Sequence, residues 1–294
     1  MGKVLKRLCH QKSTMRQKGY FYPDRDEGLT SKLIQEYDET RWTLEEVYVL
    51  KSVKKTLGEK EKLGLSMDVG TGLGRLIPFL LSISKKVIAL DADLWRLKKA
   101  MEAFDSNPNV FFMWTQGSRL DPIPPQTVDF INYSHVAQHV SHHEFIETLG
   151  EFHRVLKRGG RVLFLTTHSE GKEKFLVSTE EGAIEITRDE YEELTLTPQP
   201  KRLPVRKFDL DSLENLLREC GFEIEWKIYY HIRPEFAPRV KLREPKNPGG
   251  DPTKLLETPE KGVEDIIRNL ESINADEREA RRKALDVALL LRKG

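Results

Sequence analysis

Residues 66–75 read Ser-Met-Asp-Val-Gly-Thr-Gly-Leu-Gly-Arg, and this stretch decides the fold. A short apolar run, residues 65–69, leads into a Gly-x-Gly-x-Gly turn at Gly70, Gly72 and Gly74. Glycine reaches the positive φ values that tight turns need, and it lets backbone approach a ligand closely. A helix that follows such a turn presents its N-terminus to the ligand. The segment therefore predicts a nucleotide-type cofactor site.

A second landmark supports this site. Residues 86–91, Lys-Val-Ile-Ala-Leu-Asp, read as a buried strand that ends in the carboxylate of Asp91. A carboxylate about 20 residues beyond a glycine turn is placed to bind the hydroxyls of a ribose. The dinucleotide fingerprint has its third glycine one residue later, where this chain has Arg75. The spacing therefore argues against NAD.

Five apolar runs alternate with helical segments along the chain, near residues 65–69, 86–90, 109–113, 128–132 and 160–166. This alternation is typical of a parallel sheet that is covered by helices on both faces. A helix is predicted over 209–220, ended by Gly221, and a strand over 223–230. The sequence thus predicts a doubly wound α/β fold.

These landmarks, together with Gln116-Gly117-Ser118, Gln138-His139-Val140 after the fourth strand, and residues 154–160 (Arg-Val-Leu-Lys-Arg-Gly-Gly), resemble the class I S-adenosylmethionine-dependent methyltransferases. The group typified by the ubiquinone-biosynthesis methyltransferases is the most similar. The resemblance runs from about Leu63 to Tyr230. It implies a mostly parallel seven-stranded sheet that closes with an antiparallel strand pair, and S-adenosylmethionine as cofactor. The second strand of that pair could not be assigned from the sequence.

The resemblance also implies which residues bind the cofactor. Asp91 would hold the ribose, Asp68 the methionine amino group directly or through water, and the loop at Gln116 and Ser118 the adenine. Ser118 stands where the family usually has an aspartate, and Arg158 stands where it usually has a proline. The complete expected set is Asp68, Gly70, Thr71, Gly72, Gly74, Asp91, Ala92, Gln116, Gly117, Ser118 and Ser134.

In this family the loop after the fourth strand faces the transferable methyl group, and here it reads Asn132-Tyr133-Ser134-His135. Histidine is the commonest proton acceptor in enzymes, so His135 is the first candidate for that role. Asn132 could instead accept a hydrogen bond from an amine and align its lone pair, and Tyr133 is the third catalytic candidate. The alternative is that His135 only packs at the start of a helix.

Four histidines, His135, His139, His142 and His143, lie close together in the sequence. His135 and His139 would share one face of a helix, as zinc ligands do, but zinc also needs a convergent third ligand. The resembled family already places a histidine where His139 lies. We therefore expect no metal from this cluster.

Composition sets broad bounds. A chain of 294 residues with 38% hydrophobic residues can build a packed core, as one domain with appendages or as two small domains. The net charge is +1, but 32% charged residues with few glutamines resemble the composition of thermophile proteins. Cys9 and Cys220 are too few for a disulfide framework. No membrane span or signal peptide is recognisable, so a reducing, cytoplasmic location is expected.

Charge segregates only at the N-terminus, where residues 1–18 carry cations and no acid and are followed by the aromatic cluster 20–22. Such a segment could neutralise phosphates and stack on a base, which favours RNA as the partner, or it could be a solvated tail. An exocyclic base amine, such as that of cytidine in ribosomal RNA, is the acceptor we favour. The alternatives are a quinone, lipid or metabolite acceptor, and a non-catalytic binding protein. The cations are Lys3, Lys6, Arg7, Lys12, Arg16 and Lys18.

Three regions are predicted. Residues 1–58 form a basic, aromatic and helical extension, in which Thr43-Leu44-Glu45-Glu46 reads as a capping box that opens a helix and Gly58 ends it. Residues 59–232 form the methyltransferase domain, and residues 233–294 form a linker and a helical appendage. Two amphipathic helices are expected there, one with Val263, Ile266, Ile267 and Leu270, and one with Ala280, Ala284, Leu285, Ala288 and Leu289. They are a candidate dimer contact.

Overall fold

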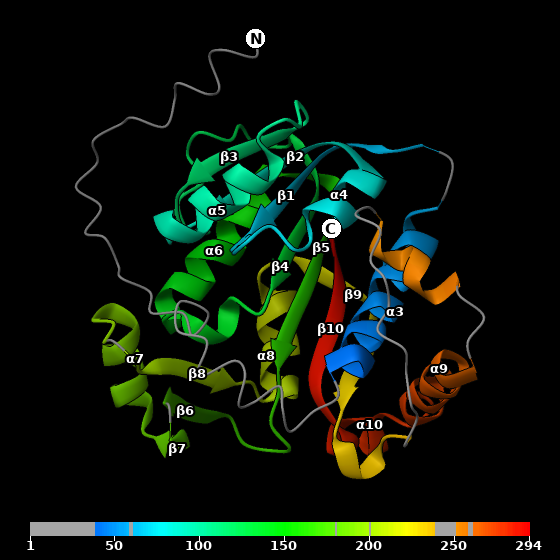
Figure 1. The fold of residues 1–294 in the computed structure, drawn as a ribbon. Helices are drawn as coiled ribbons and strands as arrows, with labels where there is room; N and C mark the ends of the chain where they lie inside the picture. Colours follow the sequence, from blue (N-terminus) through cyan, green and yellow to red (C-terminus); the bar gives the residue numbers. More distant parts are fainter. Residues whose placement is uncertain (1–38, 59–60, 180, 200, 239–250, 258–260) are drawn as a thin grey trace.

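A seven-stranded sheet forms the centre of the molecule in the computed structural model, which describes residues 39–58, 61–179, 181–199, 201–238, 251–257 and 261–294 (Figure 1). The strand order is β3-β2-β1-β4-β5-β10-β9, and only β10 runs antiparallel to its neighbours. The predicted doubly wound, mostly parallel seven-stranded sheet is confirmed. The strands are β1 (Leu63–Val69), β2 (Ser84–Asp91), β3 (Val110–Trp114), β4 (Val128–Ser134), β5 (Leu156–Thr167), β9 (Phe222–Ile232) and β10 (Ala284–Lys293).

Helices cover both faces of this sheet (Figure 1). They are α3 (Glu39–Leu57), α4 (Ile77–Ile83), α5 (Leu94–Phe104), α6 (His142–Val155), α8 (Leu210–Glu219), α9 (Lys261–Asn274) and α10 (Glu277–Lys283). Local capping fixes several starts: the Asp93 carboxylate accepts from the backbone N–H of Trp95 at 2.8 Å, and the Ser141 hydroxyl accepts from that of Glu144 at 3.1 Å. No helix in the described part of the chain is long and apolar enough to cross a membrane.

The start of α3 differs from the prediction. The helix already includes Glu39, so Thr43 lies inside it and the predicted capping box is wrong. The two glutamates of that segment make tertiary contacts instead. Glu45 accepts a hydrogen bond from the backbone N–H of Ile232 at 2.8 Å, and Glu46 forms a bidentate ion pair with Arg75. Gly58, with φ of 78°, ends the helix as expected.

The C-terminal segment also differs from the prediction. Residues 284–293 are the strand β10, inserted between β5 and β9, and the helix expected through Ala284, Leu285, Ala288 and Leu289 is wrong. Leu289 pairs with Phe164 on one side and with Lys227 on the other. Of the segment 233–294, the part after α10 thus supplies the closing strand that the sequence analysis could not place. The boundary drawn after residue 232 does not separate this segment from the sheet.

A second, smaller sheet was not predicted. It has the order β7-β6-β8, from β6 (Lys174–Thr179), β7 (Gly182–Ile186) and β8 (Leu203–Lys207), with α7 (Arg188–Leu196), and it follows the carboxyl end of β5 (Figure 1). The buried Tyr191 hydroxyl donates to the carbonyl of Val140 at 2.7 Å. The small sheet and α7 therefore hold the chain that follows β4. Two short 3-10 helices, η4 (Pro234–Phe236) and η5 (Pro252–Glu257), lie in the part of the chain predicted to be a linker.

Candidate cofactor and acceptor site

The glycine turn lies directly after β1. Gly70, Gly72 and Gly74 have φ of 75°, 55° and 86°, in the region that favours glycine. The backbone N–H groups of Gly70 and Thr71 both donate to the carbonyl of Leu90, at 2.9 Å each, which ties the turn to the end of β2. A Cβ on Gly70 would lie 2.2 Å from a methyl carbon of Val136. The turn is thus built so that only glycine fits at its first position.

Asp91 fixes the other side of the turn. One carboxylate oxygen accepts from the backbone N–H of Gly72 at 2.8 Å, and the other accepts from that of Asp93 at 2.7 Å. Burial raises the pKa of the Asp91 carboxyl, and the two N–H bonds act in the opposite direction. Each carboxylate oxygen still has a second lone pair for a hydroxyl donor.

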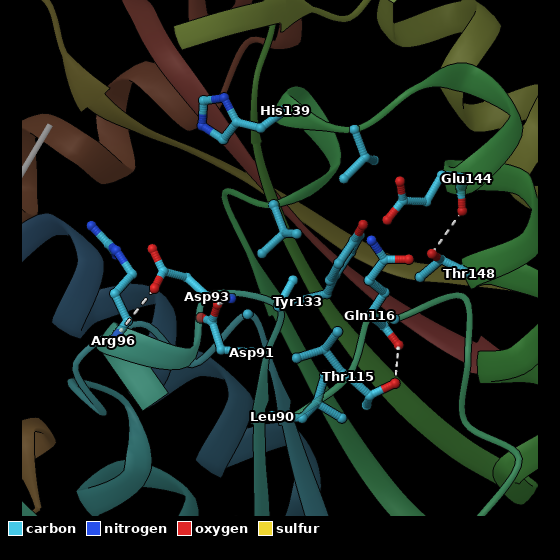
Figure 2. Close-up of a pocket in the computed structure, with 16 residues that line it drawn as sticks. Leu90, Asp91, Asp93, Arg96, Thr115, Gln116, Tyr133, His139, Glu144 and Thr148 are labelled. Atoms are coloured by element: carbon cyan, nitrogen blue, oxygen red, sulfur yellow. Dashed lines mark hydrogen bonds between the residues drawn. The ribbon is translucent and has the colours of Figure 1, made fainter. Parts of the chain in front are cut away.

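A pocket opens between the carboxyl ends of β1, β2 and β4 and the start of α6 (Figure 2). Six of the residues predicted from the sequence line it: Gly70, Asp91, Ala92, Gln116, Gly117 and Tyr133. The other residues of the wall are Val69, Leu90, Asp93, Arg96, Thr115, Val136, His139, Val140, Glu144 and Thr148. The wall combines carboxylates, among them that of Asp91, with apolar side chains, which suits a ligand that has both a diol and a flat ring.

Other predicted residues lie behind the wall or beside it. The Asp68 carboxylate is buried beneath the turn, where it accepts from the Thr71 hydroxyl at 2.7 Å and from the Asn132 side-chain amide at 2.8 Å. Asn132 is itself buried, and its Oδ1 has no hydrogen-bond partner among the described residues. Ser118 and Ser134 do not line the pocket, nor do Thr71, Gly72 and Gly74. The structure therefore gives Asp68 and Asn132 a role in shaping the turn.

Several wall residues were missed because the fold, rather than the local sequence, brings them to the pocket. Arg96 lies in the first turn of α5, and its guanidinium lies 3.1 Å from where a Cβ on Gly72 would be. Glu144 and Thr148 are one turn apart on α6, and the Thr148 hydroxyl donates to the Glu144 carbonyl at 2.7 Å (Figure 2). Their spacing of four residues was the available signal, since such pairs share one helix face.

A chain of hydrogen bonds fixes the ring orientation of His135. Burial lowers the pKa of His139 to about 4, so this ring is neutral, and its Nδ1 donates to the Pro204 carbonyl at 2.7 Å. Its Nε2 then accepts from the Gln138 amide nitrogen at 3.2 Å, which turns the Gln138 oxygen toward His135. That oxygen also accepts from the backbone N–H of Thr167 at 3.1 Å.

His135 is the next member of this chain. Its Nδ1 donates to the Gln138 oxygen at 3.3 Å, so in the neutral ring the lone pair lies on Nε2. The Tyr230 hydroxyl is 2.8 Å from that nitrogen and therefore donates to it. Tyr230 is fully buried, and burial raises its pKa well above the usual value, which keeps the hydroxyl protonated. His135 thus lies beside the cofactor pocket with a defined tautomer.

The four sequence-adjacent histidines do not meet at one point. His139 is held by Pro204, His142 lies 3.4 Å from a guanidinium nitrogen of Arg206, and the exposed His143 pairs with Glu147. His135 lies instead beside His231 and Asp286, which come from β9 and β10.

Residues 67–164 match a family model that is described as a methyltransferase domain. The matched stretch of the chain is a methyltransferase domain, and the sheet has the fold of class I methyltransferases. The cofactor of this domain is S-adenosylmethionine, and the pocket fits this molecule. The Asp91 carboxylate lines the pocket, where it can bind a ribose diol, and Gly70, which packs closely on Val136, lets the backbone approach the ligand.

Curated relatives of this methyltransferase share part of its length. An uncharacterized methyltransferase from Geobacillus kaustophilus (strain HTA426) is 28% identical over 117 residues, which cover 40% of this chain and 53% of the relative. One from Geobacillus thermodenitrificans (strain NG80-2) is 24% identical over 163 residues, covering 54% and 69%. The chain therefore spans about half the length of the first relative.

Two solved structures have the same fold as this methyltransferase. The 1,6-didemethyltoxoflavin-N1-methyltransferase of Burkholderia thailandensis, with bound 1,6-didemethyltoxoflavin and S-adenosylhomocysteine, has a TM-score of 0.52 at 16% identity and covers 92% of this chain and 89% of its own. A methyltransferase of Haloferax volcanii, in complex with the Trm112 methyltransferase activator, has a TM-score of 0.52 at 13% identity and covers 90% and 95%.

Replacing Asp91 by alanine is expected to weaken S-adenosylmethionine binding by about 1.5 to 3 kcal/mol, as for the loss of hydrogen bonds to a charged group. Calorimetric titration of the purified variant measures this. The exposed Asp105, at the end of α5, gives the matched control Asp105→Ala, which should bind like the wild type. Because Asp91 also holds the N–H of Gly72, thermal unfolding should be followed in the same samples. Unchanged affinity would show that Asp91 does not bind the ribose.

Proposed function

We propose that this protein transfers the methyl group of S-adenosylmethionine to a nitrogen or oxygen nucleophile of an RNA acceptor, which binds on the His135 side of the pocket. The observation that carries the transfer is the pocket itself, with its glycine turn, Asp91 and the neighbouring hydrogen-bonded His135. When bound, the cofactor supplies an electrophilic methyl group on a sulfonium. The chain must hold the acceptor in line with that methyl and receive a proton.

Positioning falls to the rigid end of β4. Tyr133 is buried on this strand and packs edge-on against Phe152 at a centroid distance of 5.1 Å. Asn132, fixed through its hydrogen bond to Asp68, acts in this proposal as a positioning residue rather than as a partner of the acceptor. Holding two reactants in a fixed geometry is worth several kcal/mol of the barrier.

Proton removal falls to His135. The proton that leaves the acceptor moves to the lone pair on His135 Nε2, which otherwise accepts from the Tyr230 hydroxyl 2.8 Å away. The imidazolium that results keeps its Nδ1–H on the Gln138 oxygen. Such a transfer by a positioned side chain typically contributes about 100- to 10,000-fold to a rate.

The RNA part of the proposal rests on the N-terminal sequence, which lies outside the described residues. Six cations without an acid in residues 1–18, followed by three aromatic residues, are suited to phosphates and bases. A small-molecule acceptor is the competing proposal, and the Burkholderia thailandensis enzyme, whose structure contains such an acceptor, is an example with this fold.

Deleting residues 1–18 should separate these two acceptors. We expect the deletion to leave S-adenosylmethionine affinity nearly unchanged and to abolish most methyl transfer to total RNA. Binding of single-stranded oligocytidine by the full chain should weaken with potassium chloride, with a logarithmic slope of about 0.7 per phosphate contacted, and the deletion should flatten that slope.

A charge variant serves as the control for the deletion. Changing the six cations to glutamine keeps the length and the aromatic residues, so an equal loss of RNA binding assigns the effect to charge. Identical and salt-insensitive curves for the full chain and both variants would contradict the RNA acceptor and favour a metabolite.

A further inference from the structure

Three potential metal ligands converge beside the cofactor pocket, and two of them, His231 and Asp286, were not singled out from the sequence. One nitrogen each from His135 and His231 and one oxygen from Asp286 lie within 4.8 Å of one another. They come from the loop after β4, the end of β9 and the start of β10. The strand register explains their meeting, because Asp286 pairs with Tyr230 on one side and with Thr167 on the other.

Both histidines adopt a backbone conformation that is costly for them. The described part of the chain has four non-glycine residues with positive φ, and two of these are His135, at 55°, and His231, at 52°. Such residues cost about 1 to 3 kcal/mol each and cluster at functional sites. That both strained histidines face the same carboxylate is the first indication of a built site.

Asp286 supplies the second indication. The residue is only 5% exposed, and its Oδ2 accepts from His231 Nδ1 at 2.6 Å. Its Oδ1 is buried and has no hydrogen-bond partner among the described residues. A buried carboxylate with one open oxygen is suited to a cation.

The surrounding rings hold His231 in place. Trp42 of α3 stacks on it with a centroid distance of 4.4 Å and an interplanar angle of 19°. The ring of His135 is nearly parallel to that of His231, with a centroid distance of 6.3 Å and an interplanar angle of 9°. A hydrogen bond from a ring nitrogen to a carboxylate also sets the orientation of a histidine. The ligand group is therefore preorganised from α3, β4, β9 and β10.

We propose that His135, His231 and Asp286 bind one divalent transition-metal ion. Two imidazole nitrogens and one carboxylate suit zinc or iron rather than magnesium or calcium, which prefer oxygen ligands alone. Three protein ligands leave a coordination position open for water or a substrate atom. The ion binds the His135 lone pair that otherwise accepts from the Tyr230 hydroxyl. His135 can therefore receive a proton only in the metal-free site. This inference goes beyond the proposed function and does not depend on the acceptor.

The test uses the full chain without an affinity tag, freed of metal by chelator. Titration with Zn²⁺ followed by calorimetry should give one site per chain, and Co²⁺ should give the visible absorption of a low-coordinate site with nitrogen ligands. Mg²⁺ should not compete. His231→Gln and Asp286→Asn keep size and hydrogen bonding but remove a ligand. Losing even an outer partner of a metal ligand costs about 10- to 100-fold in affinity, so each variant should bind Zn²⁺ at least about 100-fold more weakly.

The exposed His143 provides the matched control, and His143→Ala should keep the Zn²⁺ affinity of the wild type. S-adenosylmethionine affinity, measured in the same samples, confirms that each variant is folded and bears separately on the proposed function. Zn²⁺ binding that is equal in wild type, His231→Gln and Asp286→Asn would overturn the metal site. The same holds if wild-type protein that binds the cofactor takes up no Zn²⁺.

Discussion

Removing β10, residues 284–293, is expected to unfold the protein. The strand is hydrogen-bonded to β5 on one side and to β9 on the other, so its loss breaks two ladders at once. Leu289 and Leu290 are both 0% exposed, and the neighbouring strands would lose the apolar surface that covers them. Far-UV circular dichroism and urea unfolding of the truncated chain measure the effect, and we expect no cooperative transition.

Single substitutions test the same role of β10 through smaller changes in the free energy of unfolding. Leu289→Ala leaves a cavity in the core and should lower the free energy of unfolding by about 2 to 5 kcal/mol. Leu196, at the end of α7, is 61% exposed and gives the matched control. Leu196→Ala should change stability by no more than about 0.5 kcal/mol. A truncated chain that still unfolds cooperatively would contradict the central position of β10.

Changing Gly70 to alanine is expected to weaken cofactor binding at least about 100-fold, or about 2.7 kcal/mol. The new Cβ would lie 2.2 Å from a Val136 methyl, and the φ of 75° is unfavourable for alanine. Either the turn or Val136, which lines the pocket, must then move. Calorimetric titration with S-adenosylhomocysteine measures the loss.

Gly150 gives the matched control for this substitution. It lies in α6, and a Cβ there meets nothing within 4 Å. Gly150→Ala should therefore leave cofactor affinity unchanged and stabilise the helix by about 0.5 to 1 kcal/mol. Adding Val136→Ala to Gly70→Ala should recover part of the affinity, because it removes the clash but not the φ strain. Full wild-type affinity in Gly70→Ala would contradict the tight packing of the turn.

The sequence predicted the strands whose partners follow in regular order, from β1 to β5. It failed at β10 because a strand that is buried on both faces is continuously apolar. Ala284, Leu285, Ala288 and Leu289 also fit the spacing of a helix, and a short apolar run cannot be assigned by periodicity alone. The small sheet was missed for a related reason: its three strands are only five or six residues long, and they pair with one another rather than with the strands of the large sheet.

Site residues divide in the same way. Gly70 and Asp91 belong to local motifs that the sequence alone singles out, and both line the pocket, as Tyr133 does. Glu144 and Arg96 reach the pocket because α6 and α5 begin there, which depends on the assembled sheet. The pairing of His231 with Asp286 depends on the register between β9 and β10. No local pattern signals that register, because the apolar run of β10 fits a helix as well as a strand.

The insertion of β10 has a consequence for the order of folding. Phe164 of β5 pairs with Leu289, which lies far along the chain. Closing so long a loop costs conformational entropy before the strand pairing compensates for it. Until then β5 presents an open edge with Val162, Leu163, Phe164 and Leu165, all of which are fully buried in the native sheet. Exposed apolar edges of this kind pair with other chains. Refolding yield should therefore fall as protein concentration rises, with aggregation starting from a half-built sheet.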